Sequence, residues 1–141
     1  MTQPETRHGT CVAWGDGSAL IIGASGRGKS ALALQLMALG CTLVADDRVL
    51  LRPVSDGVLA ECPPSIVGMI EARGAGILNA ACQARAQVSL VVDLDQSEDQ
   101  RLPALIKTRI CGCDIPLIKR IDGPHFAAII VQILRAGWSN R

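Results

Sequence analysis

Residues 23–30 read Gly23-Ala24-Ser25-Gly26-Arg27-Gly28-Lys29-Ser30, a G-x-x-x-x-G-K-S pattern. An apolar run precedes this stretch and another follows it, which predicts a strand, a glycine-rich turn and a helix. The glycines let backbone N–H groups point at phosphate oxygens, and the helix N-terminus adds partial positive charge. Lys29 can then reach the β- and γ-phosphates, and the Ser30 hydroxyl can ligate Mg²⁺. All eight residues are therefore predicted to bind the phosphates of a nucleotide.

The composition is typical of one small domain over residues 1–141. Apolar residues make up 49% of the chain, but it has only one Phe, two Trp and no Tyr, so the core must consist of Leu, Ile, Val and Ala. With 14 basic and 13 acidic residues and few aromatics, the composition argues against DNA or RNA as a partner. No long apolar run or signal-peptide core is present, so we expect a cytoplasmic chain that does not contact a membrane.

Six cysteines stand at positions 11, 41, 62, 82, 111 and 113. No C-x-x-C pair is present, and the two histidines lack zinc-finger spacing. Disulfides are also rare in a reducing cytosol. We therefore interpret all six as structural thiols.

Hydrophobic patterning and turn residues predict alternating strands and helices. The predicted strands cover residues 8–14, 18–22, 41–45, 48–52, 58–61 and 88–94; the predicted helices cover 29–39 and 126–135; and 95–101 is predicted to be a loop. The first of these helices is apolar on nearly every face, so we expect other elements to cover it. Together these elements predict an α/β fold, a three-layer domain that contains the phosphate loop and is built around a mixed sheet.

Two adjacent carboxylates, Asp46 and Asp47, directly follow the strand predicted over residues 41–45. Ligands of α/β folds bind at such strand ends. One aspartate there can organise Mg²⁺, and its neighbour can act as a general base toward a hydroxyl. The alternative is an Asp-Asp turn that caps a neighbouring element. His8 is a further candidate, because its strand is predicted to form a hairpin with the strand before the phosphate loop; the alternative is a surface histidine near the terminus.

Four ordered motifs resemble the C-terminal catalytic domain of the HPr kinase/phosphorylase family. They are His8-Gly9, the loop 23–30, the Leu43–Asp47 stretch and Ile70–Ile77, which is similar to the family signature E-[IV]-R-G-x-G-[IV] with Ala72 at the branched position. The resemblance covers residues 7–80 well and the remainder loosely. The family's N-terminal domain has no counterpart here, so we expect either a natural short form, which the start at Met1 favours, or an excised fragment.

The resemblance implies ATP and Mg²⁺ as cofactors and an HPr-like phosphocarrier protein as partner. Lys29 would hold the transferring phosphate, while Ser30 and Glu71 would ligate Mg²⁺. Asp47 would take the proton from the acceptor serine, and Asp46 would support the metal or hold Asp47 in place. A homo-oligomer, a hexamer in this family, is implied as well.

The same resemblance implies roles for three further residues. His8 would be the active-site histidine of the family, sensing or binding phosphate. Arg73 and Arg101 would neutralise charge in the transition state. For Glu71 and Arg73 the alternative is a solvated ion pair, and for Arg101 it is a loop charge.

Three functions fit these motifs: a serine kinase acting on a phosphocarrier, a small-molecule kinase, and a nucleotide-sensing regulator with little turnover. The family's P-x-R-P-G-R-N stretch, associated with phosphorolysis, corresponds here to Lys119-Arg120-Ile121-Asp122-Gly123-Pro124-His125. The arginine and asparagine after its glycine are replaced by Pro124 and His125. We therefore expect kinase activity, and we expect phosphorylase activity to be weak.

Overall fold

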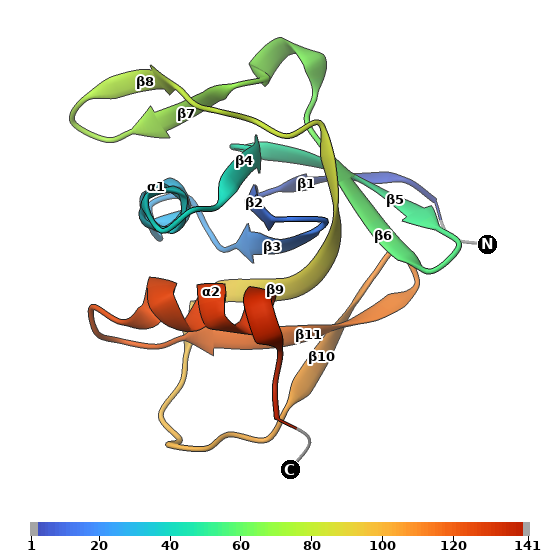
Figure 1. Ribbon diagram of the computed structural model, residues 1–141, viewed down its shortest axis with the longest axis vertical. Coiled ribbons are helices and arrows are strands. Elements are labelled where there is room, and N and C mark those ends of the chain that lie inside the picture. Colours follow the sequence, from blue (N-terminus) through green and yellow to red (C-terminus); the bar gives the residue numbers. More distant parts are fainter. Residues whose placement is uncertain (1–2, 140–141) are drawn as a thin grey trace.

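The computed structural model describes residues 3–139, so both ends of the domain predicted over 1–141 extend beyond the described part. Its largest unit is a nine-stranded mixed sheet in the order β1-β5-β6-β9-β3-β2-β4, to which β11 and β10 add beside β9 (Figure 1). A separate hairpin consists of β7 and β8. Of the two α-helices in residues 3–139, neither is long and apolar enough to cross a membrane.

The elements have the following bounds: β1 (Glu5–His8), β2 (Thr10–Trp14), β3 (Gly17–Ile22), α1 (Lys29–Ala38), β4 (Thr42–Ala45), β5 (Arg48–Val54), β6 (Gly57–Glu61), a 3₁₀ turn (Pro64–Ile66), β7 (Met69–Ala72), β8 (Gly76–Asn79), β9 (Arg85–Ser97), β10 (Ile106–Ile110), β11 (Cys113–Arg120) and α2 (Phe126–Ala136).

Three layers pack around the central strands, and the predicted α/β class with a mixed sheet is confirmed. Helices α1 and α2 cover one face, and the sheet curls so that its own outer strands cover the other (Figure 1). Strand β3 contributes to both cores because its side chains alternate. Ala19 and Ile21 pack in the core that includes the helices, whereas Leu20 packs in the core under the curled strands.

The strand predicted over residues 8–14 is wrong in one respect, because it is two strands with a break at Gly9. Strand β1 pairs with β5, whereas β2 pairs with β3 and β4. The Gly9 N–H donates to the Asp47 carbonyl oxygen at 3.1 Å. A Cβ atom at Gly9 would lie 2.8 Å from the Ile21 carbonyl oxygen, so only glycine lets the chain cross here.

Two other expectations are wrong in part. Helix α1 is not covered all round, because one side is exposed at Ala31, Gln35 and Ala38, and Leu39 just after its end is 48% exposed. The loop predicted over residues 95–101 begins three residues later, since β9 continues to Ser97 as a partner of β11.

The six cysteines are free thiols, and burial accounts for half of them: Cys11, Cys41 and Cys111. Burial raises the pKa of Cys11 to about 12, so this thiol stays neutral. Cys82 is exposed, so the interpretation of the cysteines as structural thiols does not hold for it. Cys111 begins the two-residue turn between β10 and β11, where its φ of 49° and the 80° of Gly112 allow a tight hairpin.

Candidate active site

The phosphate loop connects the end of β3 to the start of α1, as predicted. Gly26 and Gly28 have φ angles of 86° and 95°, which side-chain-bearing residues rarely adopt. A Cβ atom at either glycine would meet nothing within 4 Å, so the backbone conformation and not crowding requires glycine. The loop is therefore shaped for backbone N–H groups to converge on an anion.

Lys29 is 8% exposed and lies at the first position of α1. Its Nζ donates to the carbonyl oxygens of Gly23 and Ala24, at 2.8 and 3.1 Å. The ammonium group is thus held inside the curve of the loop, where a phosphate chain would bind.

The loop is also fixed from outside, by residues that no sequence motif marks. The Asp95 carboxylate accepts from the Ala24 N–H at 3.0 Å and pairs with Arg27 Nε at 3.2 Å. The Arg120 guanidinium donates to the Arg27 carbonyl oxygen at 2.6 Å. Asp95 lies in β9, just after the residues of that strand that pair with β3. Its position beside the loop therefore depends on the register of the sheet.

A hollow of about 340 Å³ opens beside the loop. Its walls come from β1, β2, the phosphate loop, α1, the β4–β5 turn and β7. The lining residues are His8, Thr10, Ser25, Gly26, Gly28, Lys29, Ser30, Ala31, Leu34, Asp46, Asp47, Glu71, Ala72 and Arg73. Seven residues given catalytic or metal-binding roles from the sequence therefore share one hollow.

Some predicted site residues lie outside this lining. Gly23, Ala24 and Arg27 belong to the loop but do not line the hollow, and they make the contacts described above. Arg101 lies in the exposed segment after β9 and does not line the hollow either. The extension of β9 explains this, because the Glu98 N–H donates to the Arg120 carbonyl oxygen and carries the chain along β11. The structure thus places Arg120, and not Arg101, against the phosphate loop.

Asp46 is 6% exposed and its carboxylate accepts three hydrogen bonds. The hydroxyls of Thr10 and Ser30 donate to Oδ1 at 2.9 and 2.7 Å, and the Glu71 N–H donates to Oδ2 at 2.9 Å. Asp46 therefore joins β2, α1 and β7 at one point. Thr10 was not selected from the sequence, because nothing in its neighbours marks it.

Asp47 differs from Asp46 in exposure and in conformation. Its side chain is 66% exposed and its φ is 75°, a region that aspartate tolerates better than most residues. The His8 Nδ1 lies 3.6 Å from Asp47 Oδ1, and Arg48 Nε lies 4.0 Å from Oδ2. The predicted link between His8 and the site is thus formed, although through β1 and β5 and not through the hairpin with β3.

Glu71 and Arg73 come from β7 and the turn that follows it. Along β7 the side chains of Ile70 and Ala72 are buried, and those of Met69 and Glu71 are exposed. Within residues 3–139 no ion pair joins Glu71 to Arg73, which disfavours the ion-pair alternative. Both side chains are therefore available to a ligand in the hollow.

The hollow offers hard oxygen ligands of the kind that Mg²⁺ prefers. The Ser30 hydroxyl and the Glu71 carboxylate line it, while Asp46 binds the Ser30 hydroxyl from behind. Within residues 3–139 no three acidic, histidine or cysteine side chains form a ready metal cluster. These residues fit an ion that takes most of its ligands from phosphate and water.

The chain matches the family described as "HPr Serine kinase C-terminal domain" over residues 1–122. It belongs to that family. A protein named HPr kinase/phosphorylase from Caldicellulosiruptor bescii is 51% identical to it, with 96% of this chain and 48% of the relative covered. One of the same name from Aromatoleum aromaticum is 38% identical, with 82% and 42% covered. The chain thus spans about half the length of these relatives.

The fold of this family member agrees with a solved structure. The structure titled Hpr(Ser) kinase/phosphatase from Coxiella burnetii matches with a TM-score of 0.78, covering 93% of this chain and 88% of the other. At 23% identity this likeness concerns the fold. The family resemblance inferred from the sequence motifs is confirmed.

Replacing Asp46 with alanine is expected to destabilise the protein. The substitution leaves two hydroxyls and one N–H without their acceptor in a largely buried place, which should lower the free energy of unfolding by about 3 kcal/mol. Urea denaturation followed by circular dichroism measures the change. Asp47→Asn serves as the control, because that side chain is exposed and should change stability by less than about 1 kcal/mol. Equal stability of the Asp46→Ala and unaltered proteins would contradict this role.

Proposed function

We propose that this chain is a kinase domain that transfers the γ-phosphate of ATP to a serine of an HPr-like phosphocarrier protein. One observation carries the proposal: Lys29 on the phosphate loop and Asp47 at the end of β4 line the same hollow. A phosphate donor bound by the loop would thus lie beside a carboxylate able to accept a proton. The family to which the chain belongs, and the names of its relatives, support HPr as the acceptor.

In the proposed reaction the acceptor hydroxyl oxygen forms a bond to the γ-phosphorus, and the bond from that phosphorus to the β–γ bridging oxygen breaks. Asp47 takes the hydroxyl proton, and His8 lies close enough to orient the carboxylate or to contact the phosphate. Lys29 and Arg73 offset the negative charge of the transferring group. Ser30 and Glu71 would hold Mg²⁺, which supplies further charge neutralisation when bound.

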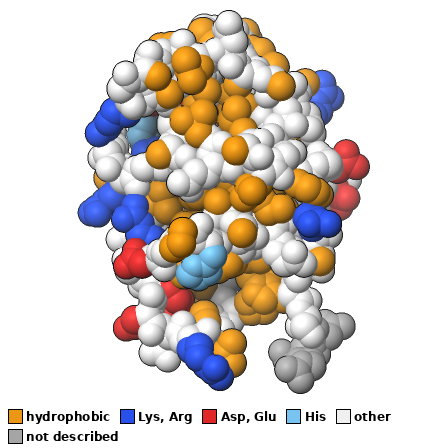
Figure 2. Space-filling view, turned by 60° about the vertical axis from the view of Figure 1, so that its left-hand side comes forward, with side chains coloured by type: hydrophobic (Ala, Val, Ile, Leu, Met, Phe, Trp, Pro, Cys, Tyr) orange, Lys and Arg blue, Asp and Glu red, His pale blue; other side chains and the backbone are white. Residues whose placement is uncertain are grey.

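Two features favour a protein over a small molecule as the acceptor. The Asp47 carboxylate is largely exposed, so a hydroxyl presented on a protein surface can reach it. Beside the hollow, the β7–β8 hairpin exposes the apolar side chains of Met69, Ile77 and Leu78. Figure 2 shows apolar side chains gathered at the top of the molecule, where this hairpin lies. Exposed apolar patches of this kind are typical of protein contacts.

Incubation with γ-labelled ATP, Mg²⁺ and purified HPr tests the proposal. We expect label on one serine of HPr and none on an HPr variant with alanine at that serine. Binding of ATP with no transfer would favour the nucleotide-sensing regulator instead. Transfer to small hydroxyl compounds, with none to HPr, would favour the small-molecule kinase.

Three sequence-based expectations accompany this proposal and stay predictions. They are a homo-oligomer, hexameric by family resemblance, a cytoplasmic location, and weak phosphorylase activity. The third rests on Pro124 and His125, which stand where the family stretch has arginine and asparagine.

A further inference from the structure

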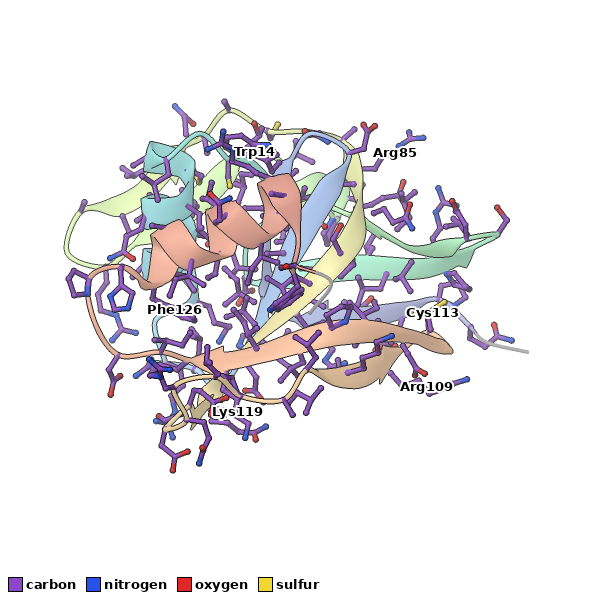
Figure 3. The ribbon with its side chains drawn as sticks, turned by 60° about the horizontal axis from the view of Figure 1, so that its bottom comes forward. Trp14, Arg85, Arg109, Cys113, Lys119 and Phe126 are labelled. Atoms are coloured by element: carbon purple, nitrogen blue, oxygen red, sulfur yellow. The ribbon has the colours of Figure 1, made fainter. Side chains whose placement is uncertain are left out.

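A second hollow, of about 240 Å³, lies on the other side of the phosphate loop. One wall is formed by the loop and α1, and the other by residues 120–126 between β11 and α2. Figure 3 shows Phe126 at the start of α2 and Lys119 on β11, the two elements that hold this segment. Of the residues given catalytic or binding roles above, only Arg27 and Gly28 of the phosphate loop line this hollow.

The two hollows meet at the phosphate loop. Gly28 and Ala31 line both of them, so a molecule seated on the loop can extend into either. The sheet explains this arrangement, because β9 is parallel to both β3 and β11. The carboxyl ends of these three strands lie at one edge of the sheet, where α/β folds bind ligands.

A nucleoside triphosphate on the loop has two different ends. Its γ-phosphate end must face Asp47 and the acceptor, which assigns that end to the first hollow. The nucleoside end must then leave the loop on another side. The second hollow begins where the loop joins α1. It therefore offers a place for the nucleoside when the γ-phosphate lies in the first hollow.

The walls of the second hollow match a nucleoside better than a second phosphate. Leu32, Leu94 and Phe126 provide apolar surface for a base. Gln35 and Asp122 add an amide and a carboxylate, which can bind base edges and ribose hydroxyls. The Asp122 carboxylate would repel a phosphate group.

The two arginines of this hollow are already engaged. Arg27 pairs with Asp95, and Arg120 donates to the Arg27 carbonyl oxygen. Such a guanidinium still has a planar face on which a base can stack. We propose that the second hollow binds the nucleoside of the nucleotide, with the base against the apolar wall and the ribose toward Asp122. This inference rests on the proposed function.

The test fills the hollow without altering the phosphate loop. Gln35→Trp places an indole in it from an exposed position of α1, so the variant should fold. Leu105→Trp is the matched control, because Leu105 is 61% exposed and lines neither hollow. Calorimetry measures the binding of Mg²⁺-ATP and of inorganic tripolyphosphate, which has the phosphates and no nucleoside.

We expect Gln35→Trp to weaken ATP binding at least tenfold and to change tripolyphosphate binding less than twofold, while Leu105→Trp changes neither. Unchanged ATP binding by Gln35→Trp, or equal loss for both ligands, would overturn the nucleoside site. Equal affinity of the unaltered protein for ATP and tripolyphosphate would overturn it too, and would leave the phosphate site in place. An unaltered protein that binds neither ligand would overturn the proposed function together with this inference.

Discussion

Replacing Lys29 with alanine is expected to lower the rate of phosphoryl transfer to HPr by at least about 10³-fold. The ammonium group lies inside the curve of the phosphate loop and would contact the charge that develops on the transferring phosphate. No other lysine lines the hollow among residues 3–139. Single-turnover transfer of labelled phosphate measures the rate.

The fold should survive this substitution. The Ala24 carbonyl oxygen that Lys29 contacts lies in an exposed residue, so water can replace the lost donor there. Lys107→Ala is the matched control, because Lys107 is an exposed residue of β10 away from the hollow, and it should transfer phosphate at the unaltered rate. A folded Lys29→Ala protein that keeps full activity would refute the role of the loop.

The second large effect is expected at Asp47. Asp47→Asn should lower kcat by about 10²–10⁴-fold, because an amide cannot accept the proton of the acceptor hydroxyl. Asparagine tolerates the φ of 75° as well as aspartate does, so the backbone should keep its conformation. The affinity for ATP should change less than about twofold, since the carboxylate acts on the acceptor and not on the nucleotide. Steady-state kinetics with HPr, and calorimetry with ATP, separate the two quantities.

Asp99→Asn is the control for this experiment, because it removes another exposed carboxylate from a loop outside the hollow. It should leave kcat unchanged. If Asp47→Asn reduced stability as Asp46→Ala is expected to do, or reduced the affinity for ATP, the division of roles between the two aspartates would be wrong.

The division between Asp46 and Asp47 shows how far the sequence could go. Their position after a strand predicted a metal-organising group and a general base at the end of that strand. Two identical side chains in succession, however, do not indicate which of them is buried. The structure separates them, because Asp46 accepts three hydrogen bonds and Asp47 turns outward in a left-handed conformation. Those contacts come from β2, α1 and β7, and only tertiary packing brings these three elements together.

His8 shows the same limit from another direction. The sequence predicted its place at the site but through the wrong partner strand, because a continuous run of strand-forming residues hides the crossing at Gly9. The close approach that requires glycine there involves the Ile21 carbonyl oxygen, twelve positions away, counting from 9 to 21. Arg101 was selected from a loosely similar segment, and the longer β9 strand keeps it out of the hollow.

The sequence by itself determined the phosphate loop, since its glycines, its lysine and its serine act within eight consecutive residues and need only local geometry. The alternation of predicted strands and helices likewise indicated the α/β class, and hydrophobic patterning indicated the central strands. Only the tertiary structure decided which distant groups hold that loop: Asp95 contacts Ala24 across 71 positions, and Arg120 contacts Arg27 across 93. The register of β3, β9 and β11 sets these contacts. Register depends on how whole strands pack, and the residues of a single segment do not encode it.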